Sequence, residues 1–259
     1  MPQKYFIGNW KMNPQSIEEA KNLITSADNF FRENGSSRDV VIGFCPPFVF
    51  IEDVARALKD SSSGQAFILG SQDIATESSG AWTGEVSASM LKNIGVQHVI
   101  VGHSERRWKM NESDELVNKK LKAVVEAGLV PIVCIGERER NENYRTFISD
   151  QLQATFKDIQ TSSFIIAYEP VWAISSNPGA EPDNPESAVE SIQLIREIMS
   201  SQLDMDISGG IFLYGGSVNP INAKGFLEKK EIDGVLVGGA SVKKDDLISL
   251  LAIMKEVAK

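Results

Sequence analysis

The run F-I-I-A-Y-E-P-V-W-A-I, residues 164–174, places a single carboxylate directly after a buried strand. Residues 164–168 are predicted to form that strand because they are apolar without interruption. Pro170 lacks an N–H and cannot continue a strand ladder. Glu169 then lies at the carboxyl end of the strand, where poor solvation is expected to raise a carboxyl pKa and favour a general base. The alternative interpretation is that Glu169 is an ordinary solvated glutamate at the end of a strand.

Seven further apolar runs follow the same pattern, and all eight alternate with amphipathic segments. They cover residues 5–8, 40–44, 67–69, 98–101, 130–135, 164–168, 211–214 and 235–237. Their continuous apolar character is typical of parallel strands covered on both faces. We therefore predict the α/β class and a (β/α)8 barrel of eight parallel strands ringed by helices. A doubly wound open sheet is the alternative, although it rarely needs eight evenly spaced units.

The segments between the strands carry signals for helix starts. Ser16 and Glu19 form a capping-box pattern ahead of a periodic apolar face. Asn184-Pro185 and Asn219-Pro220 each indicate an N-cap followed by a proline at the first helical position. Because strands alternate with helices throughout and no Pro/Ser-rich linker interrupts them, we predict a single domain over residues 1–259.

Composition excludes several classes of partner. The net charge of −9 argues against nucleic acid and anionic membranes, because both require clustered Lys and Arg. A small dianion can still bind where N–H groups and one lysine outweigh the distant negative field. No apolar run reaches membrane-spanning length and the N-terminus lacks a basic segment followed by an apolar one, so we expect a cytoplasmic protein.

The cysteines give no support for a disulfide or a metal centre. Cys45 and Cys134 both lie in apolar strand-like runs, where buried reduced thiols are expected. The two histidines lie well apart from both cysteines, so a zinc site has little support.

If the strands close a barrel, chemistry belongs at their carboxyl ends. The run G-N-W-K-M-N, residues 8–13, puts Lys11 there as a cation for an anionic substrate, with a solvated surface lysine as the alternative. The run V-G-H-S-E-R-R, residues 101–107, puts His103 before a short helical turn, whose positive end disfavours a protonated imidazole. A structural role is the alternative for His103, and it is our interpretation of His98 at the other end of that strand.

Two glycine pairs end the seventh and eighth strands, in Y-G-G-S-V at residues 214–218 and L-V-G-G-A-S at residues 236–241. Glycines let backbone N–H groups approach phosphate oxygens closely. One Gly-Gly pair usually indicates a tight turn. Two pairs at the two strand ends where barrels bind phosphate favour a phosphate site.

Together these motifs resemble the triosephosphate isomerase family, whose fold is the TIM barrel. The motifs G-N-W-K-M-N, G-A-W-T-G-E-V-S, V-G-H-S-E-R-R, C-I-G-E, A-Y-E-P-V-W-A-I, Y-G-G-S-V and L-V-G-G-A-S occur in the family's order, between Tyr5 and about Val257. Each motif is modestly specific, whereas the ordered set is highly specific. The resemblance implies an enzyme of glycolysis and gluconeogenesis that interconverts dihydroxyacetone phosphate and D-glyceraldehyde 3-phosphate through an enediolate, without a metal or organic cofactor.

The resemblance also implies a role for each matched residue in catalysis. Glu169 would take the proton from carbon, and His103 would polarise the carbonyl and shuttle a proton between the two oxygens. Lys11 would stabilise the developing oxyanion, Asn9 would help form the pocket, and Glu105 would pair with Lys11.

Binding and closure are assigned in the same way. The backbone N–H groups expected to hold the phosphate are those of Ser175, Ser217, Gly238 and Gly239. The expected lid and desolvating residues are Pro170, Val171, Trp172, Ile174 and Leu236. Ile174 and Leu236 would close over Glu169 and strip its water.

The family is commonly a homodimer, and its long third loop enters the partner subunit. The matching loop here covers residues 71–85, from Ser71 to Glu85, and Thr83 would brace Asn9 and Lys11 of the other subunit. An ordinary surface excursion is the alternative, although at about 15 residues the loop is long for a connection without a task.

The chain departs from the family pattern in the lid. Where the family continues P-V-W-A-I with Gly-Thr-Gly, this chain reads S-S-N-P-G-A-E-P-D at residues 175–183, roughly three residues longer. Ser175 and Asn177 replace both lid glycines, and Pro178 removes a donor. We therefore expect an intact active site with an altered closing loop. The alternatives are a non-catalytic or altered-activity phosphate-binding barrel and a surface-interaction role, for which the sequence offers no positive feature.

Overall fold

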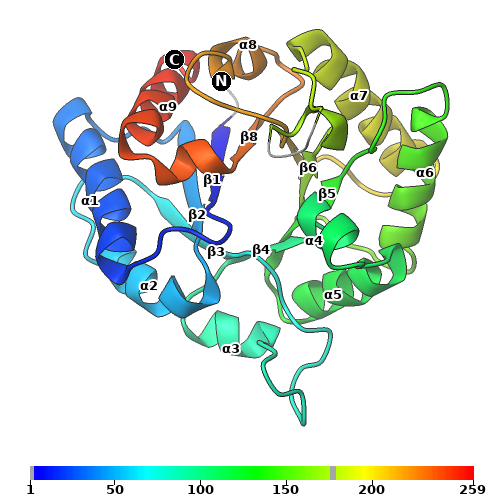
Figure 1. Ribbon diagram of the computed structural model, residues 1–259, viewed down its shortest axis with the longest axis horizontal. Helices are drawn as coiled ribbons and strands as arrows, with labels where there is room; N and C mark the ends of the chain where they lie inside the picture. The colour runs from blue at the N-terminus through cyan, green and yellow to red at the C-terminus, as the bar shows by residue number, and fades with distance from the viewer. Residues whose placement is uncertain (1–2, 176–178) are drawn as a thin grey trace.

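The computed structural model describes residues 3–175 and 179–259. Within those residues, eight parallel strands close into one barrel in chain order (Figure 1). The strands are β1 (Lys4–Asn9), β2 (Val40–Cys45), β3 (Phe67–Ser71), β4 (His98–Val101), β5 (Val130–Ile135), β6 (Ile165–Tyr168), β7 (Ile211–Tyr214) and β8 (Gly234–Val237). The predicted barrel is confirmed. The alternative of an open sheet is wrong, because β1 pairs with both β2 and β8.

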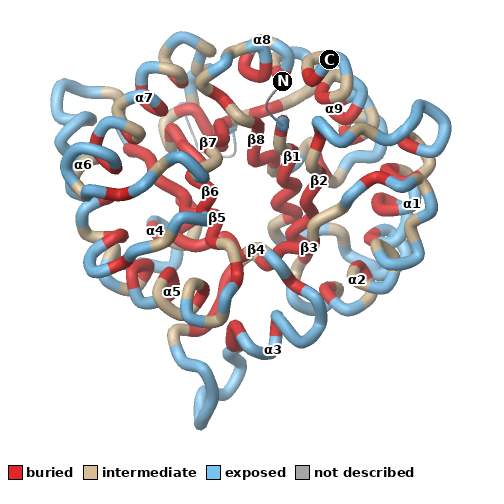
Figure 2. The backbone as a smooth tube through the Cα atoms, turned by 180° about the vertical axis from the view of Figure 1, so that it is seen from behind, coloured by how far each residue is buried: buried red, intermediate tan, exposed pale blue. Residues whose placement is uncertain are grey.

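Helices surround the barrel and keep one face in solvent (Figures 1 and 2). The α-helices are α1 (Ile17–Asn34), α2 (Ile51–Lys59), α3 (Ala88–Asn93), α4 (Ser104–Lys109), α5 (Asp114–Glu126), α6 (Tyr144–Thr155), α7 (Pro185–Ser201), α8 (Ala223–Leu227) and α9 (Lys244–Val257). Short 3₁₀ turns are η1 (Phe48–Phe50), η2 (Val171–Ala173) and η3 (Gly239–Val242). Figure 2 shows the buried strands at the centre and the exposed helix faces at the rim.

The core has two parts, one inside the barrel and one between the barrel and the helices. The inner part includes Ile7, Ile100, Ile165 and Leu213, which belong to β1, β4, β6 and β7. Cys45 and Cys134 belong to this inner part as buried free thiols, as predicted. Burial raises the pKa of Cys45 to about 12, so neither the redox nor the metal chemistry of a thiolate is favoured there.

Two of the three predicted helix starts are confirmed. The Ser16 hydroxyl accepts a hydrogen bond from the Glu19 N–H at 3.2 Å, and Asn184 accepts one from the Ser187 N–H at 3.0 Å. The capping box is only half formed, because the Glu19 carboxylate accepts a hydrogen bond from the N–H of Gln15 and not from that of Ser16. The third predicted helix start, at Asn219, is wrong.

Asn219 does not begin a helix, since α8 starts at Ala223. The Asn219 side chain instead accepts hydrogen bonds from the N–H groups of Ile221 and Asn222, at 2.8 and 3.2 Å. The chain therefore makes a side-chain-closed turn before the helix, a use that Asn serves as well as capping.

The segment between β3 and α3 projects from the barrel (Figure 1). Its first residues are held, since Asp73, Ile74 and Ala75 are buried. Residues 77–85 are exposed, and Trp82 keeps 57% of its surface accessible. An exposed tryptophan at the end of a long arm is typical of a contact with another molecule.

Candidate active site

A cavity of about 440 Å³ opens where β1, β4, β6, β7 and β8 end. The predicted residues in its wall are Asn9, Lys11, His103, Glu105, Glu169, Ile174, Ser175, Ser217, Leu236, Gly238 and Gly239. They are brought together because a closed parallel barrel gathers all carboxyl strand ends on one rim. The remaining predicted residues, Pro170, Val171 and Trp172, lie outside this wall and lead into the lid.

Glu169 follows β6 and is almost completely buried, with 2% of its surface exposed. One carboxylate oxygen accepts a hydrogen bond from the backbone N–H of Ser104 at 2.8 Å. The other lies 3.0 Å from Nε2 of His103. The carboxylate is thus desolvated, as the sequence suggested, and its two oxygens are satisfied by the end of β4.

His103 is the N-cap of α4, and its ring is fixed by that helix start. Nδ1 accepts a hydrogen bond from the N–H of Glu105 at 3.2 Å, so this nitrogen holds no proton. Nε2 then carries the ring proton and faces the Glu169 carboxylate. The predicted neutral imidazole is therefore the form that this geometry favours, with a donor directed into the cavity.

Lys11 adopts a left-handed backbone conformation, with φ of 54°, that is uncommon for a residue with a side chain. Its N–H donates to the side-chain oxygen of Asn9 at 3.1 Å, and its carbonyl accepts from the side chain of Gln72 at 2.9 Å. These bonds hold the backbone of Lys11 over the cavity. Strain of this kind is typical of functional sites.

The Lys11 ammonium pairs with Glu105 at 2.9 Å, as predicted. Burial alone would raise the pKa of Glu105, but the charge and hydrogen bond of Lys11 hold that pKa below its usual value. The Glu105 carboxylate is therefore charged at neutral pH. The pair fixes the cation beside the cavity without removing it from the wall.

The opposite part of the wall consists of small residues after β7 and β8. A side-chain carbon at Gly238 would lie 3.1 Å from the Lys11 side chain, so a larger residue would crowd the cation. The N–H of Ser175 donates to the hydroxyl of Ser217 at 2.6 Å. Four of the predicted phosphate-binding residues thus border one space.

The first part of the lid is anchored by Glu137, from the C-I-G-E motif. Its buried carboxylate accepts hydrogen bonds from the Tyr168 hydroxyl and the Trp172 indole, both at 2.9 Å. Its carbonyl accepts from the N–H of Val171. At Gly136 a side-chain carbon would lie 1.9 Å from the carbonyl oxygen of Glu169, so only glycine fits.

The second part of the lid begins with Ser175 and ends at Asp183 before α7. Asn177 and Pro178, which the sequence identified as departures, lie outside the described residues. Asp183 is partly buried, and this burial raises the pKa of its carboxyl. The Glu181 N–H donates to the carbonyl of Trp172 at 3.1 Å and ties the two parts together.

Sequence reasoning did not assign a role to Ser104, Gln72 or Glu137. Ser104 and Glu137 stand inside quoted motifs, so their positions were available, but their hydrogen bonds depend on how neighbouring strands align. Gln72 lies in the loop 71–85 but outside the motif quoted from it. Residues that position other side chains through hydrogen bonds are difficult to identify from one sequence, because their partners come from distant segments.

The described part of the chain has neither a metal-binding cluster nor a membrane-spanning helix. No group of three or more His, Cys, Asp and Glu side chains there could hold a metal ion. No helix among the same residues has the length and apolar character needed to cross a bilayer.

Comparisons with known proteins agree on one family. The family model described as Triosephosphate isomerase matches residues 4–255. Proteins named triosephosphate isomerase from Alkaliphilus oremlandii (strain OhILAs) and Aquifex aeolicus (strain VF5) are 40% and 39% identical to this chain, over 97% and 96% of its length and 99% and 98% of theirs. The protein of that name from Endomicrobium trichonymphae is 40% identical over 98% of this chain and all of its own length. The chain belongs to the triosephosphate isomerase family.

Proposed function

We propose that this protein is a triose-phosphate isomerase, which interconverts dihydroxyacetone phosphate and D-glyceraldehyde 3-phosphate in glycolysis and gluconeogenesis. The observation that carries the proposal is one cavity lined by a buried carboxylate, an imidazole and a cation. The reaction moves a proton between adjacent carbons, and these three groups are what such a transfer requires.

Glu169 is the base. It removes a proton from the substrate carbon next to the carbonyl and returns it to the neighbouring carbon. Because both of its oxygens now accept hydrogen bonds, at 2.8 and 3.0 Å, it must exchange one of these donors for the substrate. The Ser104 N–H belongs to the backbone of α4 and cannot follow the side chain of Glu169. A carboxylate that moves toward the substrate would therefore leave this donor.

His103 and Lys11 stabilise the negative oxygen of the enediolate. The Nε2 proton of a neutral His103 donates to the carbonyl oxygen and is passed between the two substrate oxygens. The Lys11 ammonium supplies a full positive charge beside them. In a cavity with little water, such charge stabilisation is stronger than in bulk solvent.

The substrate phosphate is held by backbone N–H groups of Ser175, Ser217, Gly238 and Gly239. A dianion in a protein of net charge −9 needs a local positive field. Lys11 and converging N–H dipoles provide one. The Ser217 hydroxyl now accepts the Ser175 N–H, and phosphate oxygens would replace it as the acceptor.

The lid excludes water and keeps the enediolate from losing its phosphate. Glu137 fixes the start of the lid through Trp172, so closure moves Ile174 and Ser175 against a firm support. Ile174 and Leu236 already line the cavity on which Glu169 opens. A barrel that binds phosphate without catalysis has no observation in its favour.

The test is a coupled assay of glyceraldehyde 3-phosphate isomerisation that also monitors free phosphate and methylglyoxal. Glu169→Asp and Lys11→Met are assayed beside the unaltered chain. We expect fast turnover with little phosphate release, and a large loss in both variants. Turnover with abundant release would show a leaking lid, and no turnover with retained binding of 2-phosphoglycolate would contradict the proposal.

The assembly that fits this function is a homodimer of single-domain subunits. The loop 71–85, which is exposed over residues 77–85 and includes Trp82 and Thr83, is the arm that would enter the partner and brace its Asn9 and Lys11. Analytical ultracentrifugation tests it, because Trp82→Glu should shift the protein to monomers. A cytoplasmic location is supported by the reduced state of both cysteines and by a phosphorylated metabolite as substrate.

A further inference from the structure

A second cavity, of about 340 Å³, lies next to the active site. It is bounded by α4, by the turn after β5 and by four described residues of the lid, Val171, Trp172, Ile174 and Gly179. Two of its wall residues, Glu105 and Ile174, also line the active-site cavity. Its volume falls within the range of small-molecule sites. The proposed reaction makes no use of it.

Two indole rings supply the apolar surface of this cavity, from Trp108 and Trp172. Trp108 is 38% exposed and stacks on Phe147 at a centroid distance of 6.4 Å, so its ring is supported from behind. Trp172 is held by its hydrogen bond to Glu137. Large aromatic surfaces that are fixed in place lose little entropy when a flat molecule binds.

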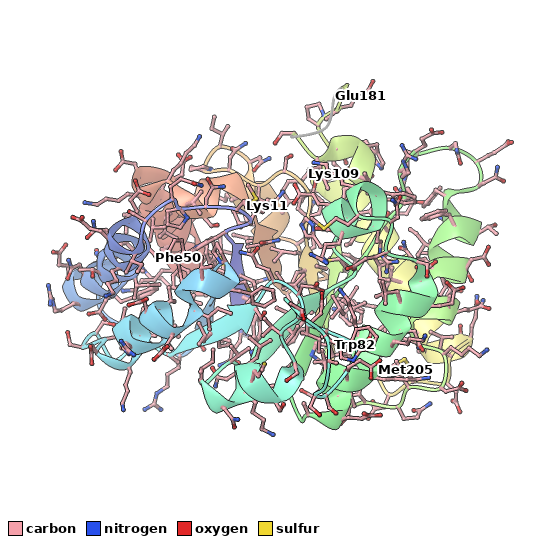
Figure 3. The ribbon with its side chains drawn as sticks, turned by 60° about the horizontal axis from the view of Figure 1, so that its bottom comes forward. Lys11, Phe50, Trp82, Lys109, Glu181 and Met205 are labelled. Atoms are coloured by element: carbon pink, nitrogen blue, oxygen red, sulfur yellow. The ribbon has the colours of Figure 1, made fainter. Side chains whose placement is uncertain are left out.

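The same cavity has an excess of positive charge. Lys109 lies 3.9 Å from Glu105, which is already paired more closely with Lys11 at 2.9 Å. The guanidinium of Arg138 lies 4.9 Å from the centre of the Trp108 ring. Within the described residues, Arg138 makes no ion pair within 4.0 Å. Figure 3 shows Lys109 on the same side of the barrel as Lys11.

We propose that this cavity binds a small aromatic anion, such as an aromatic carboxylate or sulfonate. The ring would lie against Trp108 and Trp172, and the acidic group would pair with Arg138 and Lys109. The charge argues for an anion, because the wall holds two cations, Lys109 and Arg138, against one carboxylate, Glu105, in a chain with a net charge of −9. The indoles argue for an aromatic ring on that anion.

Binding in this cavity is coupled to the active site through the lid. Val171, Trp172, Ile174 and Gly179 form part of its wall, so a bound molecule contacts the lid directly. Any movement of the lid toward the substrate changes those contacts, and the two ligands must then alter each other's affinity by the same factor. This coupling rests on the proposed function, whereas the binding does not.

The probe is naphthalene-1-sulfonate, which has the required ring and charge but no phosphate, measured by calorimetric titration of the intact chain. We expect one probe per subunit. Arg138→Ser and Trp108→Ala should each weaken binding about tenfold, the effect of losing roughly 1.4 kcal/mol. Arg38→Ser, which removes an exposed arginine outside the cavity wall, is the matched control and should leave the affinity unchanged.

Trp108→Phe keeps an aromatic ring and protects the test from a misfolded alanine variant. It should retain most of the affinity, and a thermal unfolding scan checks each variant. Equal affinity in the unaltered chain, Arg138→Ser and Trp108→Ala would overturn the proposal, as would no binding at millimolar probe.

A second titration separates this cavity from the active site. In the presence of saturating 2-phosphoglycolate, the probe should still bind. The factor by which 2-phosphoglycolate changes the affinity of the probe should equal the factor by which the probe changes the affinity of 2-phosphoglycolate. Complete displacement with unaffected variants would place the probe in the active site and overturn the proposal. An unchanged affinity would overturn the coupling and leave the site itself supported. If isomerase activity is absent but Trp108→Ala weakens the probe, only the proposed function fails.

Discussion

The chain has two histidines, and they flank the same strand: β4 begins with His98, and His103 follows its last residue by two positions. At the carboxyl end, both ring nitrogens of His103 have partners, Glu105 and Glu169. At the amino end, Nδ1 of His98 is buried and has no hydrogen-bond partner among residues 3–175 and 179–259, and burial lowers the pKa of this ring to about 4. The environment of His103 fixes the orientation of its ring, whereas the environment of His98 only disfavours its protonated form.

The difference follows from strand direction. Helix starts follow the carboxyl ends of parallel strands, and their free N–H groups point into the rim. Ser104 and Glu105 supply such N–H groups to Glu169 and His103. The amino ends of the strands follow the C-termini of helices, which offer no free N–H groups. Polar side chains near these ends instead form hydrogen bonds with nearby turns. Asp28, which binds the turn before β3, is an example.

Replacing Glu169 by Gln should have the largest effect, because it removes the proposed base from the rim of the barrel. We expect kcat to fall by about 100- to 10,000-fold, the contribution of general base catalysis. Steady-state kinetics measures it, with circular dichroism to confirm folding. A loss of less than tenfold would mean that another group takes the proton.

The two histidines provide a matched pair of substitutions. His103→Gln should lower kcat by about 100-fold, because the proposed donor to the substrate oxygen is lost. His98→Gln should leave kcat within a factor of about two, since that ring contacts no part of the site. Similar losses in the two variants would break the comparison between the two ends of β4.

Removing Asp28 should reduce stability without affecting catalysis. Its carboxylate accepts hydrogen bonds from the N–H groups of Ser62 and Ser63, at 3.2 and 2.9 Å, and from the Ser61 hydroxyl. Asp28→Ala should lower the free energy of unfolding by about 2 kcal/mol at neutral pH, because these donors lose a charged acceptor. Urea denaturation measures this loss, and unchanged kcat is the control.

The loss in Asp28→Ala should also shrink in acid. Burial by itself would raise the pKa of Asp28, but hydrogen bonds from Ser61 and Ser63 hold it well below its ordinary value of 3.8. A depressed carboxyl pKa stabilises the folded state above the unfolded value and loses that effect as pH falls through the folded one. A pH-independent difference between the variant and the unaltered chain would contradict this account.

His98 should show its effect only as a pH dependence of stability in acid. Its pKa falls from 6.5 to about 4 on folding, so the unfolded state binds more protons between these values. The free energy of unfolding should therefore decline as pH falls from 6.5 toward 4, and His98→Gln should show less of this decline. Denaturation curves across that range measure the slope.

Much of the candidate site could be predicted because most of its residues directly follow a strand. The apolar runs located all eight strands to within a residue or two, and the residue after each run was automatically a rim residue. Lys11, His103 and Glu169 were found in this way. Where a boundary depended on which hydrogen bond Asn219 makes, the local pattern fitted two outcomes, and the prediction chose the wrong one.

By itself, the sequence determined the order of strands and helices, the buried character of each strand and the chemical types available at the rim. These are local properties, set by apolar periodicity and backbone propensity. Only the tertiary structure decided that Ser104 holds Glu169, that Glu137 anchors Trp172 and that Trp108 and Arg138 border a second cavity. Such contacts join segments distant in the chain, and their distances depend on barrel closure and strand register, which no local pattern specifies.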